Sequence, residues 1–343
     1  MSGNLISPCS FWLPERSSVG SGWAQHAPFA FWLIDAYRPK TIVELGTHKG
    51  YSFAAFCQTV KKLNIDTQCF AVDTWQGDEH AGRYSDEVYD ELKEYIDSRY
   101  SGFSHMIRST FDDALPSFAD GSIDLLHIDG RHYFEDVSHD FQSWIPKLKP
   151  NAVVLFHDTN VHERGFGVHK LWAEMVQKYP HFEFLHGNGL GVLGMGNEFP
   201  PAVRDLFDAA SSPAADVIRD SYSRLGAAAS DHFEMTVVTV AEAKAQRLEI
   251  LLQEASKRAA EGGEREAHAA RVIETLTARA DAAEHALRVV QGSIAVQNRI
   301  PIARRRYAIS PRRKSAPLDN AISLAGAHGV APASSCYAAW WPV

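Results

Sequence analysis

Cysteine is scarce in this chain, and its few copies form no pattern. The 343 residues include four cysteines, at positions 9, 57, 69 and 336, with no paired spacing. This usage excludes a disulfide framework and a cysteine zinc site, and it fits a reducing compartment. No apolar run reaches the roughly 20 residues of a membrane span, and no basic and then apolar stretch marks an export signal. We therefore expect a cytoplasmic protein without a membrane span.

Positive charge is also in deficit. The net charge is −8, which argues against a protein dedicated to nucleic acid, so we expect no specific nucleic-acid partner. Hydrophobic residues make up 45% of the chain and charged residues 22%, enough to bury a core. The composition therefore excludes global disorder.

Strand-like and helix-like runs alternate through the first 200 residues, which predicts a parallel sheet covered by helices on both faces. Strands are expected at residues 41–45, 68–73, 105–108, 123–129, 152–157, 181–185 and 190–195. The last two runs are separated by Gly187, Asn188 and Gly189, a turn that reverses the chain. The predicted fold is a doubly wound α/β fold. Its sheet is seven-stranded and mostly parallel, its last strand is antiparallel, and a long helical, coiled-coil-like C-terminal region follows.

The order of these segments predicts five regions. A flexible arm, residues 1–22, precedes an α/β domain at residues 23–200. Within that domain, residues 74–104 form an insert at the carboxyl end of the second strand, where inserts cover ligand crevices. The insert is therefore interpreted as a substrate lid, with a decorative surface helix as the alternative.

The C-terminal third has a different composition. Residues 201–237 are predicted to be a helical linker. Over residues 238–290, small and apolar residues recur at alternating three- and four-residue spacing, broken only by Gly262 and Glu266. This spacing predicts a coiled coil and a homo-oligomer formed through it, with a solvated single helix as the alternative. Residues 291–343 are basic and aperiodic, which predicts a disordered tail.

The strongest local motif follows the first predicted strand and reads V-E-L-G-T-H-K-G-Y-S from residue 43. Gly46 and Gly50 would let a ligand approach the backbone closely. The dinucleotide glycine fingerprint is missing, because His48 and Tyr51 stand where its later glycines would fall. Glu44 would repel phosphate and would suit a cationic ligand instead. A nicotinamide enzyme is therefore disfavoured.

Acidic residues and histidines lie at the carboxyl ends of the other predicted inner strands. Asp73 falls where a ribose-binding carboxylate belongs, and Ser109 begins a stretch that could flank an adenine. Asp129, His157 and Asp158 could together hold a divalent cation through oxygen and imidazole ligands. His132, just past the fourth strand, could act as a general base on a hydroxyl. The alternative for each acid is a helix or turn cap.

Taken in order, these motifs make residues 41–196 resemble a class I S-adenosylmethionine-dependent methyltransferase. The chain is most similar to the branch with V-E-L-G-x-x-x-G-x-S, V-D-T-W-x-G-D, H-I-D-G-x-H-x-Y and L-F-H-D, which is related to macrocin-type O-methyltransferases and cephalosporin-hydroxylase-like proteins. The resemblance implies S-adenosylmethionine as cofactor and Mg²⁺ or another divalent cation as an aid. It also implies O-methylation of a sugar or small natural product, so the partner would be a small-molecule or glycan hydroxyl acceptor.

The resemblance also implies roles for individual residues. Asp73 would hold the ribose, Asp129 would lie near the methionine end and the metal, and His157 would replace an acid of the metal-dependent relatives. The methionine part of the cofactor would lie among Glu44, Gly46, Thr47, Gly50 and Ser52. Asp129 and His132 are the candidate catalytic residues. The alternative function is a catalytically idle scaffold whose coiled coil recruits partner enzymes.

Overall fold

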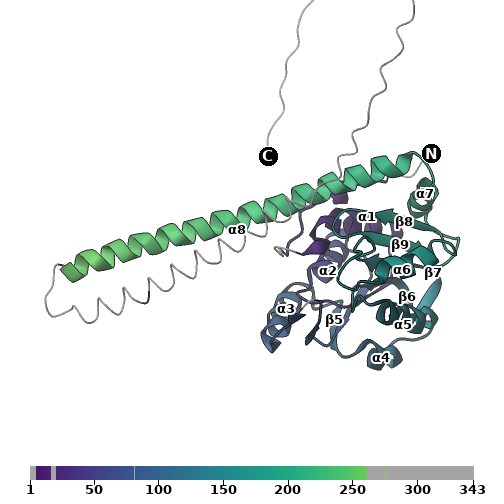
Figure 1. The fold of residues 1–343 in the computed structure, drawn as a ribbon, viewed down its shortest axis with the longest axis horizontal. Helices are drawn as coiled ribbons and strands as arrows, with labels where there is room; N and C mark the ends of the chain where they lie inside the picture. Colours follow the sequence, from purple (N-terminus) through teal and green to yellow (C-terminus); the bar gives the residue numbers. More distant parts are fainter. Residues whose placement is uncertain (1–4, 17–20, 81, 261–274, 276–343) are drawn as a thin grey trace, which may run out of the picture. The chain divides into compact units, whose positions relative to one another are not determined.

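A seven-stranded sheet forms the centre of the chain in the computed structural model, which describes residues 5–16, 21–80, 82–260 and 275 (Figure 1). The strand order among these residues is β5-β2-β1-β6-β7-β9-β8. The strands are β1 (Thr41–Leu45), β2 (Gln68–Asp73), β5 (Ser104–Arg108), β6 (Ile123–Ile128), β7 (Leu148–His157), β8 (His181–Phe184) and β9 (Leu190–Gly194).

The strands of the sheet run in the predicted directions. Strands β5, β2, β1, β6 and β7 are parallel, whereas β9 pairs antiparallel with both β7 and β8. The mostly parallel sheet with an antiparallel last strand is thus confirmed. The chain leaves β1 in one direction and returns to its other side at β6, so a crevice opens at the carboxyl ends of these two strands.

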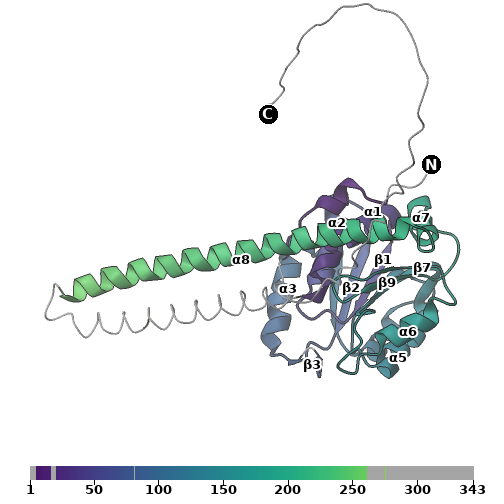
Figure 2. The same cartoon turned by 45° about the horizontal axis from the view of Figure 1, so that its top comes forward.

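Helices cover both faces of the sheet (Figure 2). Helices α1 (Ala27–Tyr37) and α2 (Tyr51–Leu63) pack on one face, in the cluster that contains Ile42. Helices α5 (Phe134–Trp144) and α6 (Val168–Met175) pack on the other face, with Val43. Successive residues of a strand point to opposite faces, so inner strands buried on both sides are apolar nearly throughout.

The structure describes the insert after β2 at residues 74–80 and 82–104. The insert forms a short antiparallel hairpin, β3 (Gly77–Asp78) with β4 (Gly82–Arg83), followed by α3 (Asp86–Tyr100). Between β5 and β6 lie α4 (Phe111–Ala114) and η3 (Leu115–Ser117), and η4 (Ile145–Lys147) precedes β7.

The expected flexible arm is instead packed over the residues described. The 3-10 helix η1 (Pro8–Phe11) buries Cys9, whose Sγ donates to the Phe31 carbonyl at 3.3 Å. Arg16 Nε donates to the Lys49 carbonyl at 2.7 Å. A second 3-10 helix, η2 (Gly22–His26), leads directly into α1. Local Ser, Pro and Gly content suggested a loose segment, but long-range packing orders it.

The C-terminal part begins with α7 (Pro201–Ala209) and continues as α8 (Ala214–Ala260). Tyr222 of α8 is buried, and a Cβ on Gly226 would lie 2.1 Å from the Gln25 carbonyl oxygen, so glycine permits α8 to contact η2. The described helix reaches into the predicted coiled coil, but residues 261–274 and 276–290 lie outside the described residues, as does the predicted tail at 291–343. The coiled coil therefore stays a prediction. No helix among the described residues is long and apolar enough to cross a membrane.

Candidate active site

A cleft of about 560 Å³ opens at the carboxyl ends of β1, β2, β6 and β7. Ligand pockets commonly have volumes of about 300–1,000 Å³. The cleft brings together residues from loops far apart in the sequence. Its lining comprises Ser21, Gly22, Trp23, Gly46, Thr47, His48, Lys49, Tyr51, Ser52, Asp73, Thr74, Gly77, Asp78, His80, Tyr84, Thr110, Phe111, Asp129, Gly130, Arg131, His132, His157, Asp158 and Asn188.

The glycine turn after β1 is shaped by contacts within the protein. Gly46 has φ +85°, and a Cβ there would lie 2.2 Å from the Asp129 carbonyl oxygen. Gly50 has φ +70°, and a Cβ there would lie 2.4 Å from Leu92 of α3. Both glycines were expected to admit a ligand, and Gly46 lines the cleft whereas Gly50 does not. Both also have a conformation and a closeness to protein atoms that favour glycine.

Asp73 caps this same turn from the end of β2. Its Oδ2 accepts hydrogen bonds from the backbone N–H groups of Thr47 at 2.8 Å and His48 at 2.9 Å, and its Oδ1 accepts one from Trp75 at 2.7 Å. A carboxylate offers about four acceptor positions. About one position, on Oδ1, therefore remains for a ligand, so the predicted ribose role and the alternative cap role are compatible.

Glu44 does not reach the cleft. Its side chain is fully buried on the face covered by α1 and α2, where its Oε2 lies 2.9 Å from Nδ1 of His127. The expectation that Glu44 contacts a ligand therefore needs correction. Glu44 shares a face with Ile42, because side chains alternate along β1, and this orientation leads into the core.

The other predicted cofactor contacts divide into two groups. Thr47 and Ser52 line the cleft, as expected. Ser109 does not line it and instead donates its backbone N–H to the Asp73 carbonyl at 3.0 Å. The next two residues, Thr110 and Phe111, occupy that part of the wall.

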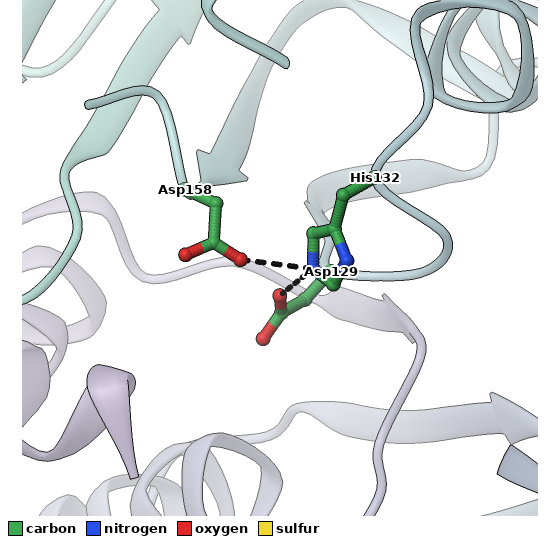
Figure 3. Close-up of side chains that lie close together, drawn as sticks. All are labelled: Asp129, His132 and Asp158. Carbon is green, nitrogen blue, oxygen red and sulfur yellow. Dashed lines mark ion pairs between the residues drawn. The ribbon is translucent and has the colours of Figure 1, made fainter. Parts of the chain in front are cut away.

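Asp129, His132 and Asp158 form a compact cluster at the ends of β6 and β7 (Figure 3). His132 Nε2 lies 2.8 Å from Asp158 Oδ2 and 3.6 Å from Asp129 Oδ1. Each of the three residues offers a ligand atom within 4.8 Å of the others, so the cluster could hold a metal ion. Asp158 has φ +62°, and its buried Oδ1 has no hydrogen-bond partner among the described residues.

His157 lies directly beside this cluster. Its Nε2 donates to the Gly187 carbonyl at 3.0 Å, and its Nδ1 lies 3.1 Å from Asp129 Oδ1 and 3.4 Å from Asp158 Oδ2. Its predicted ligand partners, Asp129 and Asp158, thus surround a single imidazole nitrogen. The orientation of that nitrogen is fixed by the carbonyl on the opposite side of the ring.

The mixture of acids and imidazoles shifts their pKa values in opposite directions. Burial disfavours a charged His132, but its hydrogen bonds with Asp129 and Asp158 prevail and raise its pKa to about 9. Burial likewise opposes protonation of His157, yet Asp158 and Asp129 raise its pKa well above the usual range. Burial would raise the pKa of Asp129, but His157 and His132 lower it to about 2. The cluster therefore holds protons on its imidazoles at neutral pH.

Two parts of the cleft were missed by sequence reasoning. Helix η2 supplies a wall through Trp23, and the hairpin turn supplies Asn188. From the insert, His80 Nε2 donates to the Arg164 carbonyl and the Arg164 guanidinium donates to the His80 carbonyl, both at 3.0 Å. These contacts join segments far apart in sequence, and no local sequence motif predicts them.

Residues 43–159 match a protein family described as a methyltransferase domain. The match includes Asp73 and all of Asp129, His132 and Asp158, whereas Trp23 lies outside it.

A curated relative extends the similarity further along the chain. The uncharacterized protein y4gI of Sinorhizobium fredii (strain NBRC 101917 / NGR234) is 43% identical over 260 residues, which are 71% of this chain and 28% of that protein. The chain thus spans less than a third of the length of this relative.

Solved methyltransferases are similar to the chain at low identity. The O-methyltransferase TomG of Streptomyces achromogenes, solved in complex with SAM, is 12% identical and has a TM-score of 0.39, with 55% of this chain and 93% of that chain covered. A methyltransferase of Geobacter sulfurreducens is 15% identical and has a TM-score of 0.38, with 50% and 78% covered. At these values the likeness bears on neither substrate nor mechanism.

Proposed function

Because residues 43–159 are a methyltransferase domain, as the resemblance to class I enzymes predicted, we propose that this chain transfers a methyl group from S-adenosylmethionine to a hydroxyl of a sugar or small natural product. One observation carries the proposal: a single cleft contains the glycine turn, Asp73 and the cluster of Asp129, His132 and Asp158. Donor and acceptor chemistry would therefore meet in one place.

The donor would lie along the turn after β1. The remaining acceptor position of Asp73 suits a ribose hydroxyl, and the hydroxyls of Thr47 and Ser52 suit the polar groups of the methionine part. Thr110 and Phe111 would flank the adenine in place of Ser109. A sulfonium methyl group needs little activation, so the residues chiefly bind and orient the two substrates.

The acceptor hydroxyl needs to lose a proton, and His132 is the candidate base. A proton taken up at Nε2 gives an imidazolium that Asp158, at 2.8 Å, and Asp129, at 3.6 Å, stabilise. The same carboxylates keep this nitrogen protonated at neutral pH, since the pKa of His132 is about 9. The raised pKa makes His132 a stronger base. It also lowers the fraction of His132 that is unprotonated, and so able to accept a proton, at neutral pH.

The two carboxylates of this cluster suit a divalent ion. Asp129 and Asp158 would hold it together with the neighbouring His157, which would give up its Nδ1 proton, while His132 stays the candidate base. The Nε2 proton of His157 is held by the Gly187 carbonyl, an arrangement common for metal-binding histidines. The buried Oδ1 of Asp158, which has no hydrogen-bond partner among the described residues, would be available as a ligand atom. When bound, the ion would acidify the acceptor hydroxyl and offset the charge of the carboxylates.

We expect chelator-treated protein to bind one equivalent of Mn²⁺ or Mg²⁺ in a calorimetric titration. Asp158→Asn should weaken the binding at least about tenfold, because it removes a charged ligand. Asp112→Asn is the matched control, since Asp112 pairs with His139 at 2.9 Å outside the cleft. A protein that binds neither ion at millimolar concentration would contradict the metal proposal.

The direct test of the function is calorimetric binding of S-adenosylmethionine, followed by transfer of a labelled methyl group to hydroxylated small molecules. Binding of a nicotinamide dinucleotide and not of S-adenosylmethionine would overturn it. Binding of the donor without transfer to any hydroxyl acceptor would favour the alternative proposal, a scaffold that presents α8 to partner enzymes.

A further inference from the structure

The turn after β1 contains several residues in left-handed backbone conformations. Positive φ angles occur at Gly46 (+85°), His48 (+49°) and Gly50 (+70°). Such a conformation is unfavourable for a non-glycine residue like His48, so the surrounding structure must hold it. Four residues of the turn line the cleft: Gly46, Thr47, His48 and Lys49. The contacts that hold the turn therefore shape the wall along which the donor would bind.

Contacts from outside the turn hold its backbone. Asp73 accepts hydrogen bonds from two of its N–H groups, as described above. The indole Nε1 of Trp75 donates to the His48 carbonyl at 3.0 Å. The Lys49 carbonyl accepts a hydrogen bond from Arg16 Nε at 2.7 Å. Asp73 and Trp75 lie within the residues that match the methyltransferase family, whereas Arg16 belongs to the N-terminal segment and lies outside that match.

The Arg16 guanidinium is oriented by further contacts with α3. It donates to both carboxylate oxygens of Glu91, from Nη1 to Oε1 at 3.2 Å and from Nη2 to Oε2 at 2.6 Å. Its central carbon lies 4.7 Å from the ring centroid of Tyr95. The Arg16 side chain is 10% exposed, whereas that of Glu91 is 64% exposed. An ion pair with so exposed a partner contributes little to stability, so its main effect is to direct the guanidinium toward the turn.

The segment that carries Arg16 is itself anchored on two helices. The Glu15 backbone N–H donates to Gln58 Oε1 at 2.8 Å, and Gln58 Nε2 donates to the Leu13 carbonyl at 2.9 Å. The Tyr100 hydroxyl donates to Glu15 Oε2 at 3.1 Å. Gln58 belongs to α2 and is buried, and Tyr100 ends α3. A planar arginine on an anchored segment fixes the position of a carbonyl better than a flexible lysine would.

We propose that Arg16 is a positioning residue for the methyl donor, which acts through the Lys49 carbonyl to keep the turn after β1 in its binding conformation. The inference rests on the proposed function and extends the donor site to the N-terminal segment. Loss of the contact lowers the fraction of molecules whose turn is ready to bind, and the apparent affinity falls by the same factor. Once the donor is bound the turn has its native conformation, so the chemical step is unchanged.

The test compares donor binding and turnover in two Arg16 variants. Arg16→Ala should weaken calorimetric binding of S-adenosylmethionine about tenfold, raise the KM for the donor by a similar factor and leave kcat within about twofold. Arg16→Lys keeps a cation but not the planar fork, and it should weaken binding about threefold. A merely structural role would lower the unfolding temperature without changing the donor affinity.

Arg219→Ala is the matched control, because Arg219 makes the same three kinds of contact elsewhere. Its Nε donates to the Glu183 carbonyl at 2.8 Å, and its Nη1 lies 3.3 Å from Asp216 Oδ1. Its guanidinium carbon lies 5.2 Å from the ring centroid of Phe182. These four described residues are not part of the cleft lining. Arg219→Ala should therefore keep the donor affinity of the unmodified protein.

Hydrogen exchange of the ligand-free protein tests the positioning without the donor. The Gly50 amide donates to the Thr47 carbonyl within the turn at 2.7 Å. It should exchange faster in Arg16→Ala but not in Arg219→Ala, because only the first change loosens the turn. Unchanged exchange, or unchanged donor affinity in folded Arg16 variants, would overturn the inference while leaving the proposed function intact. Wild-type protein that does not bind S-adenosylmethionine would overturn both.

Discussion

Replacing Asp73 with alanine is expected to weaken binding of S-adenosylmethionine more than about hundredfold. A hydrogen bond from a ribose hydroxyl to this charged carboxylate contributes about 1.5–3 kcal/mol to binding. Alanine also removes the acceptor that holds the backbone N–H groups of Thr47, His48 and Trp75, so the turn that would carry the donor is no longer fixed. A loss of about 2.7 kcal/mol already corresponds to a hundredfold change in affinity. Calorimetric titration of the donor measures the effect.

Thermal unfolding separates the two roles of Asp73. Because the carboxylate caps the turn after β1, Asp73→Ala should also lower the stability of the protein without ligand. Asp73→Asn keeps one acceptor oxygen and should give intermediate losses in both measurements. Unchanged donor affinity in a folded Asp73→Ala protein would exclude Asp73 from the binding site.

The second large effect concerns His132. His132→Asn should lower the rate of methyl transfer about 10²- to 10⁴-fold, the usual contribution of a general base. In the unmodified enzyme without metal, the rate should rise with pH and level off near pH 9, because only the unprotonated imidazole accepts a proton and its pKa is about 9. Initial rates across this pH range are the measurement. A pH-independent rate, or full activity of the variant, would remove His132 from the mechanism.

The stability of chelator-treated protein should follow the same titration. The pKa of His132 in the fold, about 9, is above the ordinary value of 6.5, so the folded state binds this proton more tightly than the unfolded state. The stabilisation is fully present below pH 6.5 and is lost as the pH rises through 9. Relative to His132→Asn, the unfolding free energy should fall by up to about 3 kcal/mol over this range. Denaturant titrations of both proteins at several pH values measure the difference.

Much of the fold could be read from periodicity and turns. The runs at 41–45 and 68–73 coincide with β1 and β2. The reversal of the last hairpin followed from Gly187 and Gly189, since so short a turn leaves only an antiparallel return. The convergence of Asp129 and Asp158 was predictable as well, because the carboxyl ends of neighbouring parallel strands meet at one edge of a sheet.

The sequence did not predict side-chain orientation at the strand ends or the packing of segments far apart in the chain. Glu44 and Leu45 end the same strand, and the sequence does not say which of them points into the crevice and which into the core. The buried position of Glu44 depends on its hydrogen bond with His127, which lies 83 residues later in the chain and on the adjacent strand. The contribution of η2 was equally inaccessible, because Trp23 reads as an ordinary apolar residue at the start of a helix.

The contact between α8 and η2 connects the long helix to the wall of the cleft. At Gly226 the long helix lies against Gln25, two residues from Trp23 in the cleft wall. A partner that displaces α8 would remove this contact from the backbone next to Trp23. Association along the helix and occupancy of the cleft would then be thermodynamically linked, and such linkage is reciprocal. Bulkier side chains at position 226 would break the contact through which the two events communicate.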